Sequence, residues 1–504
     1  MLQKILKIFR LHWPLLLILL VTGFFFTFRL ERDLLWDWDE CLYAQYPKEM
    51  RQTGNFLINQ WNGFRDLQKP PLYSWLLAIS TSPGANEFNI RLFSIVFGLA
   101  LIAVLYVFTK KYFSERVAIL ATLIMFASEL FVVYMRRANT DIGFMFFIFL
   151  GVYAWFLSHK KSNFSYLAGF FFGLSVMMKG FSVIPYLAAL FITIFFNFKR
   201  EKLLNFVKLS VVFATTVIPW HLAAYLTYGK EFVQLYVLDN IIKRAQNPIE
   251  FHYGGRLFYA KLIYKEIFPW LFFAAVFPLY KAVTVIPNLI RDLKKNNPIQ
   301  QMLKRVRHDV KANEVLYTII LLVILPLIAI TRIKTKIAWY VLPIYPFLAI
   351  FLAYCMDVLL KKLKHSIFFY LLVVLILLDA SILINKETRF LEKTRTVDPR
   401  YEVVLKSGEY PSKTLDYLVA FSERQAEAIL PPEQEITQTF VYGGNPCAVY
   451  YSNKKVNYYY DMEKFKKRLQ RKGLFLLENG DLKLIEKLPI KILFKNSDYT
   501  LFSY

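Results

Sequence analysis

The chain has 504 residues, of which 56% are hydrophobic, 18% aromatic and 20% charged. Its mean hydropathy of +0.37 lies above the range of soluble globular proteins, so a wholly soluble protein is excluded. The apolar residues form long continuous runs, which indicates membrane-spanning helices rather than the alternating strands of a barrel. The formal net charge of +25 is better explained by cytoplasmic Lys and Arg than by nucleic acid binding.

Eleven apolar runs are predicted to span the membrane. They are 12–28, 90–109, 117–134, 142–157, 164–178, 181–197, 205–222, 257–280, 316–330, 337–355 and 366–384. The first run follows Lys4, Lys7 and Arg10 and has no small-residue cleavage site after it, so we predict a signal anchor with its N-terminus inside. An odd number of spans keeps the basic stretch 281–315 in the cytoplasm and puts the C-terminal tail outside, in the periplasm of a bacterium.

Two blocks outside the spans are too long to be simple connections. Residues 29–89 belong to the predicted membrane domain, residues 1–385, and contain two short aromatic-rich pieces, 37–50 and 70–80. Each piece is too short to cross a bilayer, so both are predicted as helices that lie on the outer face of the membrane that the spans cross.

The tail, residues 386–504, is predicted as a small α/β domain. Strands are expected at TFVYGG (439–444) and VYYSNKKVNYYY (449–460), and a helix at DMEKFKKRLQRKG (461–473). The segment LFLLENGDLKLIEK (474–487) is expected to be a hairpin that turns at Asn479 and Gly480. The three cysteines, Cys41, Cys355 and Cys447, show neither a CxxC nor a zinc-type spacing and are predicted to be structural bystanders.

Charged residues within and beside the spans fall toward the outer ends of the predicted helices. Those within the spans are Glu129, Lys261, Lys265, Glu266 and Asp379, and those in the adjoining outer loops are Arg136, Arg137, Asp141, Lys179, Arg332, Lys334 and Lys336. Taken singly, each has a structural alternative as a headgroup contact or an interhelical pair. Because ionisable groups at membrane depth are costly, their gathering on one side predicts a polar cavity near the outer leaflet. A conduction path would place such groups across the full depth.

The loop between the first two spans carries the most informative motif. Asp37, Asp39 and Glu40 follow the first span, and Lys69 precedes the Pro70–Pro71 pair. A carboxylate at the mouth of a charged cavity can act as a general base or position an acceptor. A nearby lysine can hold a phosphate as a point charge. A solvated acidic loop is the alternative.

In order and spacing, this loop resembles the bacterial aminoarabinose transferase (ArnT) group of GT-C type. These are polytopic glycosyltransferases related to the protein mannosyltransferases. The residues that match are Asp39, Glu40, Tyr43, Ala44, Glu49, Met50, Asn62, Gly63, Lys69, Pro70, Pro71 and Leu72. Later matches are Asp141 in RRANTD, Glu250 and His252 in IEFHYGG, then Lys336, Tyr340, Leu342 and Pro343, and finally Asp498 and Tyr499. Two positions depart from the family pattern, Leu42 and Gln68, and they bear on the substrate more than on the reaction.

The resemblance implies a GT-C enzyme of the bacterial inner membrane whose active site faces the periplasm. It would transfer a sugar from a polyprenyl (undecaprenyl) phosphate donor to lipid A or another glycolipid. The implied catalytic residues are Asp39, Asp141 and Glu40, the donor phosphate ligands are Lys69, Arg332, Lys334 and Lys336, and the other cavity residues are Tyr43, Arg137, Glu250, His252 and Tyr340.

Two other functions stay open at this point. Within the enzyme class, a protein O-mannosyltransferase would use a protein hydroxyl as acceptor. From another class, a flippase for lipid-linked sugars would share the spans and the lipid binding, but it needs polar residues through the whole depth. The expected partners are the lipid-linked donor, a glycolipid or protein acceptor and membrane lipid, with no nucleic acid. No cofactor is assigned, and the common Asp-x-Asp pattern of Asp37 and Asp39 leaves a divalent cation open.

Overall fold

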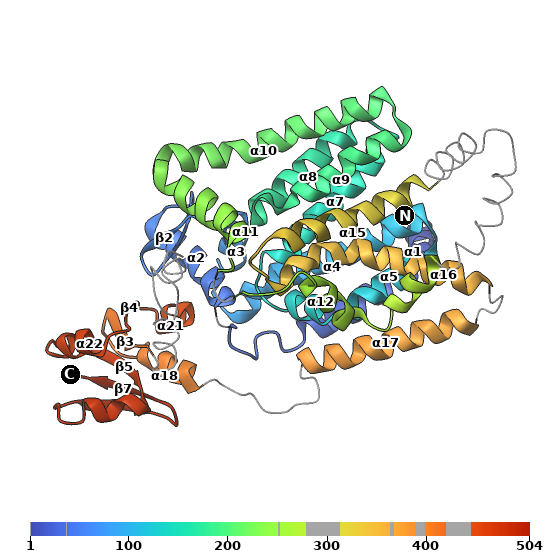
Figure 1. The fold of residues 1–504 in the computed structure, drawn as a ribbon. Helices are drawn as coiled ribbons and strands as arrows, with labels where there is room; N and C mark the ends of the chain where they lie inside the picture. Colours follow the sequence, from blue (N-terminus) through green and yellow to red (C-terminus); the bar gives the residue numbers. More distant parts are fainter. Residues whose placement is uncertain are drawn as a thin grey trace, which may run out of the picture.

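Long apolar helices make up most of the chain, and a small α/β domain packs at one end of them (Figure 1). The computed structural model describes residues 2–36, 38–249, 252–278, 313–362, 367–388, 399–419 and 445–504. The apolar helices are α1 (Leu2–Thr27), α4 (Glu87–Tyr112), α5 (Glu115–Phe126), α6 (Glu129–Met135), α7 (Asp141–Ser158), α8 (Phe164–Lys179), α9 (Ile184–Ile194), α10 (Arg200–Phe232), α12 (Phe258–Ile267), α15 (Glu314–Arg332), α16 (Tyr345–Lys362) and α17 (Ile367–Thr388).

Within the described ranges, six helical segments are long and apolar enough to cross a membrane, or seven if a bent pair is one span. Three shorter apolar helices, Trp13–Thr27, Phe164–Lys179 and Phe181–Ile194, coincide with further predicted runs. The most apolar windows of α10, α15 and α17 are each only 22% buried by protein, which leaves apolar faces of the kind that lipid covers. The prediction of a multi-pass helical membrane protein is confirmed, and the count of eleven spans stays a prediction.

Several spans differ in shape from the continuous helices that were predicted. The run 117–134 is broken into α5 and α6, which meet at 76°, because Ser128 caps α6 by accepting a hydrogen bond from the Phe131 amide. The run 181–197 is divided into η1 (Phe181–Val183), α9 and η2 (Phe195–Asn197). The run 205–222 lies inside the longer α10, which continues into η3 (Val233–Lys243) and α11 (Arg244–Gln246). Short 3-10 helix η4 (Ala338–Ile344) precedes α16. The run 257–280 is described only as far as residue 278.

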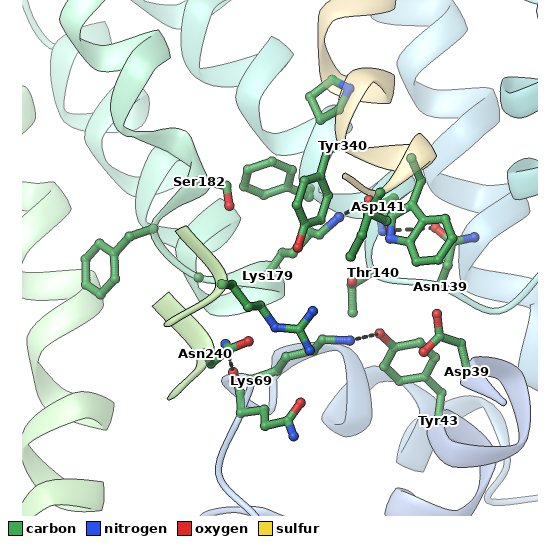
Figure 2. Close-up of a pocket in the computed structure, with 18 of the residues that line it drawn as sticks. Asp39, Tyr43, Lys69, Asn139, Thr140, Asp141, Lys179, Ser182, Asn240 and Tyr340 are labelled. Carbon is green, nitrogen blue, oxygen red and sulfur yellow. Dashed lines mark hydrogen bonds and ion pairs between the residues drawn. The ribbon is translucent and has the colours of Figure 1, made fainter. Parts of the chain in front are cut away.

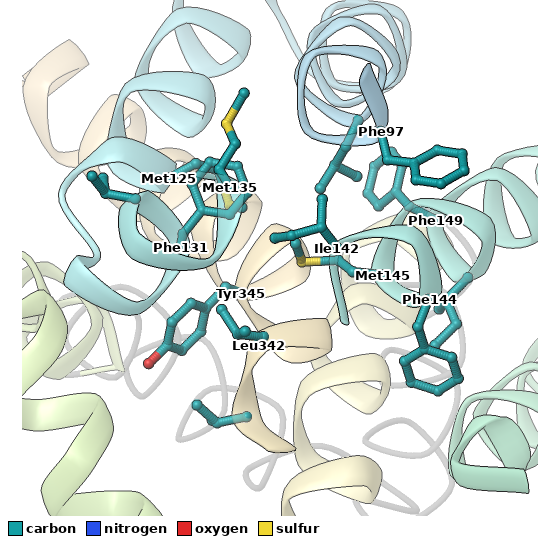
Figure 3. Packing of buried hydrophobic residues seen from close by; sticks show 14 of the residues in the cluster. Phe97, Met125, Phe131, Met135, Ile142, Phe144, Met145, Phe149, Leu342 and Tyr345 are labelled. Atoms are coloured by element: carbon teal, nitrogen blue, oxygen red, sulfur yellow. The ribbon is translucent and has the colours of Figure 1, made fainter. Parts of the chain in front are cut away.

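The helix bundle is held by close packing of apolar side chains. Figure 3 shows Phe97, Phe144, Met145 and Phe149 interleaved at its centre, all of them buried. Helices α8 and α10 approach closely at Gly169, where an added Cβ would lie 2.2 Å from the Leu209 carbonyl oxygen. Small residues allow such backbone approach between membrane helices, where lipid provides little hydrophobic drive for association.

Residues 29–89, the predicted first outer loop, contain both predicted helices and a hairpin that was not predicted. The helices are α2 (Asp39–Thr53) and α3 (Leu72–Ser80), and the strands between them are β1 (Asn59–Trp61) and β2 (Phe64–Asp66). Asn62 and Gly63 form the turn with φ of 54° and 80°, the left-handed conformation that two-residue hairpins favour. That the two helices lie on the membrane surface stays a prediction.

The C-terminal domain contains a five-stranded mixed sheet with the order β4-β3-β5-β7-β6. Its elements are α18 (Pro399–Ser407), β3 (Thr414–Leu418), α21 (Pro446–Ser452), β4 (Lys455–Tyr459), α22 (Met462–Leu469), β5 (Leu474–Glu478), η6 (Asn479–Leu484), β6 (Lys491–Lys495) and β7 (Tyr499–Ser503). Strands β4, β3 and β5 are parallel, whereas β5, β7 and β6 are antiparallel. The predicted helix at 461–473 is present as α22.

Three details of the tail were predicted wrongly, and one lies outside the described residues. The segment 449–460 begins as the end of α21 and becomes a strand only at Lys455. The hairpin at Asn479 is absent, because the side-chain amide of Asn479 donates to the Asn496 and Ser497 carbonyls and β5 pairs instead with β7. Cys41 and Cys447 are joined in a disulfide. The expected strand 439–444 falls outside the described ranges.

Candidate active site

A cavity of about 850 Å³ opens where the first outer loop meets the ends of several membrane helices. Its walls come from α2, the segment that leads into α3, the α6–α7 and α8–α9 connections, η3 with α11, and the α15–η4 region (Figure 2). In the predicted map, these helix ends all lie on the outer side. Of the twelve charged residues from which a cavity was predicted, Arg137, Asp141 and Lys179 line this one.

Asp39 is the first residue of α2 and faces the cavity near Tyr43 and Lys69 (Figure 2). Among the described residues, nothing donates a hydrogen bond to its carboxylate, which is partly exposed. Such a carboxylate keeps its acceptor sites for a ligand. Asp39 is thus available to a substrate group within the cavity.

Asp141, the second predicted carboxylate, begins α7 on another wall of the same cavity. It is buried and forms an ion pair with Lys179, the last residue of α8. The Asn139 side chain accepts a hydrogen bond from the Asp141 amide at 2.9 Å. The Lys179 ammonium neutralises the charge of Asp141. In this respect Asp141 differs from Asp39, for which the described residues provide no ion-pair partner.

Lys69 reaches the cavity from the loop before α3, and its Nζ donates to the Tyr43 hydroxyl at 2.7 Å. Burial raises the pKa of Tyr43 to about 12, with Lys69 opposing the rise, so the phenol is neutral at pH 7. Burial opposes the charge of Lys69, but neighbouring Tyr43 and Asp39 leave its pKa raised overall. The ammonium therefore stays charged and has further donor protons for a ligand.

The other predicted phosphate ligands are not part of the cavity wall. The Lys336 ammonium donates to the carbonyls of Ile330, Thr331 and Ile333, at 3.3 Å and 2.7 Å for the first two. It thus satisfies carbonyls at the C-terminal end of α15, where cations are favourable. Arg332 and Lys334 do not line the cavity either. Of the four predicted ligands, only Lys69 contacts the cavity.

Other basic side chains take their place. Lys179, Arg244 and Arg137 line the cavity with Lys69. Lys179 stood out in the sequence as a charge at an outer helix end, but nothing in its pattern distinguished it from Lys334 or Lys336. Arg244 is the first residue of α11, and its surroundings in the sequence gave no signal.

Glu40, the third residue predicted as catalytic, also lines the cavity and forms a buried ion pair with Arg91 of α4 at 2.8 Å. Its oxygens also accept hydrogen bonds from the Trp36 amide at 2.7 Å and the Ala138 amide at 2.6 Å. Arg91 further donates to the Leu30 and Leu34 carbonyls. This network ties the segment before Asp39 to the segment before Asp141, so the contacts of Glu40 fit a positioning role.

The remaining predicted residues fall in two groups. Tyr43, Arg137, His252 and Tyr340 line the cavity, whereas Glu250 lies outside the described residues. The Arg137 guanidinium lies 3.4 Å from the centre of the Trp36 ring, and Lys179 lies 5.1 Å from that of Tyr340. In the described part of the chain, no three His, Cys, Asp or Glu side chains form a cluster of the kind that holds a metal.

Thr140 is a cavity residue that the sequence did not single out. Figure 2 shows its side chain between the Lys179–Asp141 side of the cavity and the Lys69–Tyr43 side. The residue is 2% exposed, and its Oγ1 lies beside the Tyr43 hydroxyl but makes no hydrogen bond of ordinary geometry with the described residues. A buried hydroxyl without a partner carries a desolvation cost, which a ligand hydrogen bond would remove.

Comparison with known proteins supports the resemblance. Residues 68–222 match the family described as dolichyl-phosphate-mannose-protein mannosyltransferase. An uncharacterized protein of Aquifex aeolicus (strain VF5) is 27% identical over 373 residues, which is 72% of this chain and 68% of that protein. The undecaprenyl phosphate-alpha-4-amino-4-deoxy-L-arabinose arabinosyl transferase of Pseudomonas aeruginosa (strain UCBPP-PA14) is 28% identical over 272 residues, 52% of this chain and 49% of that enzyme. The chain thus spans about half the length of that transferase.

The fold agrees over nearly the whole length. The crystal structure of ArnT from Cupriavidus metallidurans bound to undecaprenyl phosphate superposes with a TM-score of 0.64 at 13% identity and covers 98% of both chains. The apo structure of the same protein gives a TM-score of 0.65 at 13% identity, with 97% of each chain covered. These comparisons confirm the resemblance that the first-loop motif indicated: the chain is similar in sequence to the arabinosyl transferases and shares the fold of ArnT.

Proposed function

We propose that the protein transfers a sugar from a polyprenyl phosphate donor, such as undecaprenyl phosphate, to a periplasmic acceptor such as lipid A or another glycolipid. One observation carries this proposal: one cavity holds the Asp39 carboxylate together with the basic side chains of Lys69, Lys179 and Arg244. Cations at the membrane edge can stabilise the phosphate of a lipid-linked donor. A carboxylate near the reacting carbon can take the proton of a hydroxyl acceptor or orient the acceptor. The likeness to arabinosyl transferases and to ArnT supports the same reaction class.

In this reaction, the bond between the sugar's anomeric carbon and the phosphate oxygen breaks as a bond to the acceptor oxygen forms. The departing lipid phosphate gains negative charge, which the Lys69 ammonium is placed to stabilise. Asp39 takes the proton of a hydroxyl acceptor, or orients the acceptor if that is itself a phosphate. The Asp141–Lys179 pair forms the wall beyond them, and Thr140 offers its hydroxyl between the two groups.

We further propose that all eleven predicted runs cross the bacterial inner membrane and that the cavity and residues 386–504 face the periplasm. The distribution of Lys and Arg supports this orientation. The disulfide between Cys41 and Cys447 gives independent support, since such bonds persist in oxidising compartments and are rare in the cytosol. Cys41 lies in the first outer loop and Cys447 in the C-terminal domain, which the map places on the same side.

A protein O-mannosyltransferase is the second candidate, favoured by the match of residues 68–222 to that family. The two candidates share the donor chemistry and differ in the acceptor. A flippase is less well supported, because the core of the bundle contains many buried Phe and Met side chains (Figure 3). A sugar headgroup crossing that region would lose its hydrogen bonds.

The experiment compares a deletion strain with its parent by mass spectrometry of lipid A, other glycans and periplasmic proteins. The expected result is the loss of one sugar from a glycolipid in the deletion strain and its return on complementation. Loss of a sugar from a protein would favour the mannosyltransferase instead. Unchanged acceptors, with a lipid-linked sugar displaced between the leaflets, would overturn the transferase.

A further inference from the structure

The helix that carries Asp39 has little to hold it in place on its own. Helix α2 has 15 residues, no side-chain hydrogen bond at its N-cap Trp38, and an internal proline, Pro47. Proline removes a backbone hydrogen bond from a helix interior, and isolated helices of this length are marginal in water. The position of α2 must therefore come from its contacts with the rest of the protein.

Helix α2 packs against α3, β1 and α21. Asp39, Leu42, Tyr43 and Tyr46 form one face of the helix and, with Glu40, line the cavity. Cys41 lies off this face, where it is buried and bonded to Cys447 of α21. Helix α2 is thus fastened to the C-terminal domain only two residues from Asp39.

Further contacts fasten the same domain to the surrounding loop. The Asn62 side chain, at the hairpin turn, donates to the Val456 carbonyl at 2.8 Å and accepts from the Val456 amide at 3.0 Å. The Tyr451 hydroxyl accepts from the Leu35 amide at 2.7 Å and donates to Glu87 at 3.0 Å. The C-terminal domain thereby contacts the segment before α2, the hairpin after it and the start of α4. Figure 1 shows α21 beside α2 at this end of the bundle.

We propose that the C-terminal domain is a covalent clamp that positions α2, and with it Asp39 and Tyr43, at the cavity. The proposal rests on the proposed transfer reaction for its effect on turnover, but not for its effect on α2 itself. The disulfide keeps the domain at a high effective concentration against the loop, so that the Asn62 and Tyr451 hydrogen bonds re-form whenever they open. The role of Cys41 and Cys447 is thus positional.

The test compares purified wild-type protein with Cys41→Ala/Cys447→Ala, Asn62→Gly and the triple variant. Glycine at position 62 keeps the left-handed turn and removes only the side-chain contacts with Val456. Cys355→Ala is the matched control, since Cys355 is a buried free thiol on α16. Two readouts are taken: hydrogen exchange of the α2 amides, and kcat and KM with a polyprenyl phosphate sugar per folded molecule.

We expect α2 to exchange faster in the double variant and kcat to fall about tenfold with KM little changed, since a misplacement of about 1 Å can cost up to about 10² in rate. Asn62→Gly alone should change either readout less than twofold, because the tether remains, yet it should lower kcat about tenfold more when the disulfide is absent. Cys355→Ala should match the wild type.

Unchanged α2 exchange and kcat in the triple variant would overturn the clamp. A lower melting temperature with wild-type turnover per folded molecule would also overturn it, because the bond would then only stabilise. If the cysteine variants do not accumulate, the double variant Asn62→Gly/Tyr451→Phe is made in the disulfide-bonded protein. It should speed hydrogen exchange of the α2 amides, and unchanged exchange in this variant would overturn the clamp. A wild-type protein that transfers no sugar would refute the proposed function, while α2 exchange would still decide the clamp.

Discussion

Two lysines that look alike in the sequence are expected to behave differently when each is changed to methionine. Lys69→Met removes the cation that reaches the cavity beside Tyr43, 2.7 Å away. Lys336→Met removes a cation whose donors are used by carbonyls at the end of α15. Both changes keep the length of the side chain and delete one charge. They therefore separate phosphate binding from helix capping.

The expected magnitude follows from these contacts. A fixed charge aimed at a developing anion contributes about 3 kcal/mol, so Lys69→Met should lower kcat by about 10² or more. Lys336→Met loses hydrogen bonds made by a charged group, each worth about 1.5–3 kcal/mol, so it should lower the melting temperature. Its turnover per folded molecule should stay close to that of the wild type, since Lys336 does not line the cavity.

The assay is transfer from a defined polyprenyl phosphate sugar by purified variants in detergent, with the folded fraction measured in parallel. Detergent removes anionic lipid, so headgroup anchoring does not contribute to the difference. Wild-type turnover from Lys69→Met would refute the assignment of the donor phosphate. A kcat lowered equally in both variants, at equal folded fractions, would refute the separation of the two lysines.

Three further predictions concern the carboxylate, the buried hydroxyl and the orientation. Asp39→Asn keeps the side-chain shape and should lower turnover by about 10² at unchanged expression, and near-normal turnover would mean that Asp39 is only a solvated acid. Thr140→Val should lower transfer about tenfold while the melting temperature holds or rises, because a buried hydroxyl without a hydrogen bond is removed. Thr140→Ser should retain activity, and equal activity of the Val and Ser variants would exclude a substrate contact. Periplasmic reporters fused after residue 400 should be active, whereas activity of cytoplasmic reporters alone would reject both the map and the outward-facing site.

The site shows how far local sequence patterns reach. Asp39, Lys69 and Tyr43 share one short loop whose motif has a fixed order, and all three line the cavity. Glu40 belongs to the same motif, but its function depends on Arg91, which is 51 residues away. Lys336 caps the end of α15 in this structure. A basic residue after a helix has the same spacing in the sequence whether it caps that helix or faces a cavity.

By itself, the sequence determined the class of the protein and the chemistry of the first loop. Long apolar runs require helices in a bilayer, since each backbone polar group must be satisfied within its own segment. Only the tertiary structure decided that Lys179 and Arg244 join Lys69, that β5 pairs with β7, and that Cys41 meets Cys447 across 406 residues. The periodicity of apolar residues and the spacing of motif residues depend only on the few residues around a position. Contacts between distant segments depend on how the whole chain packs.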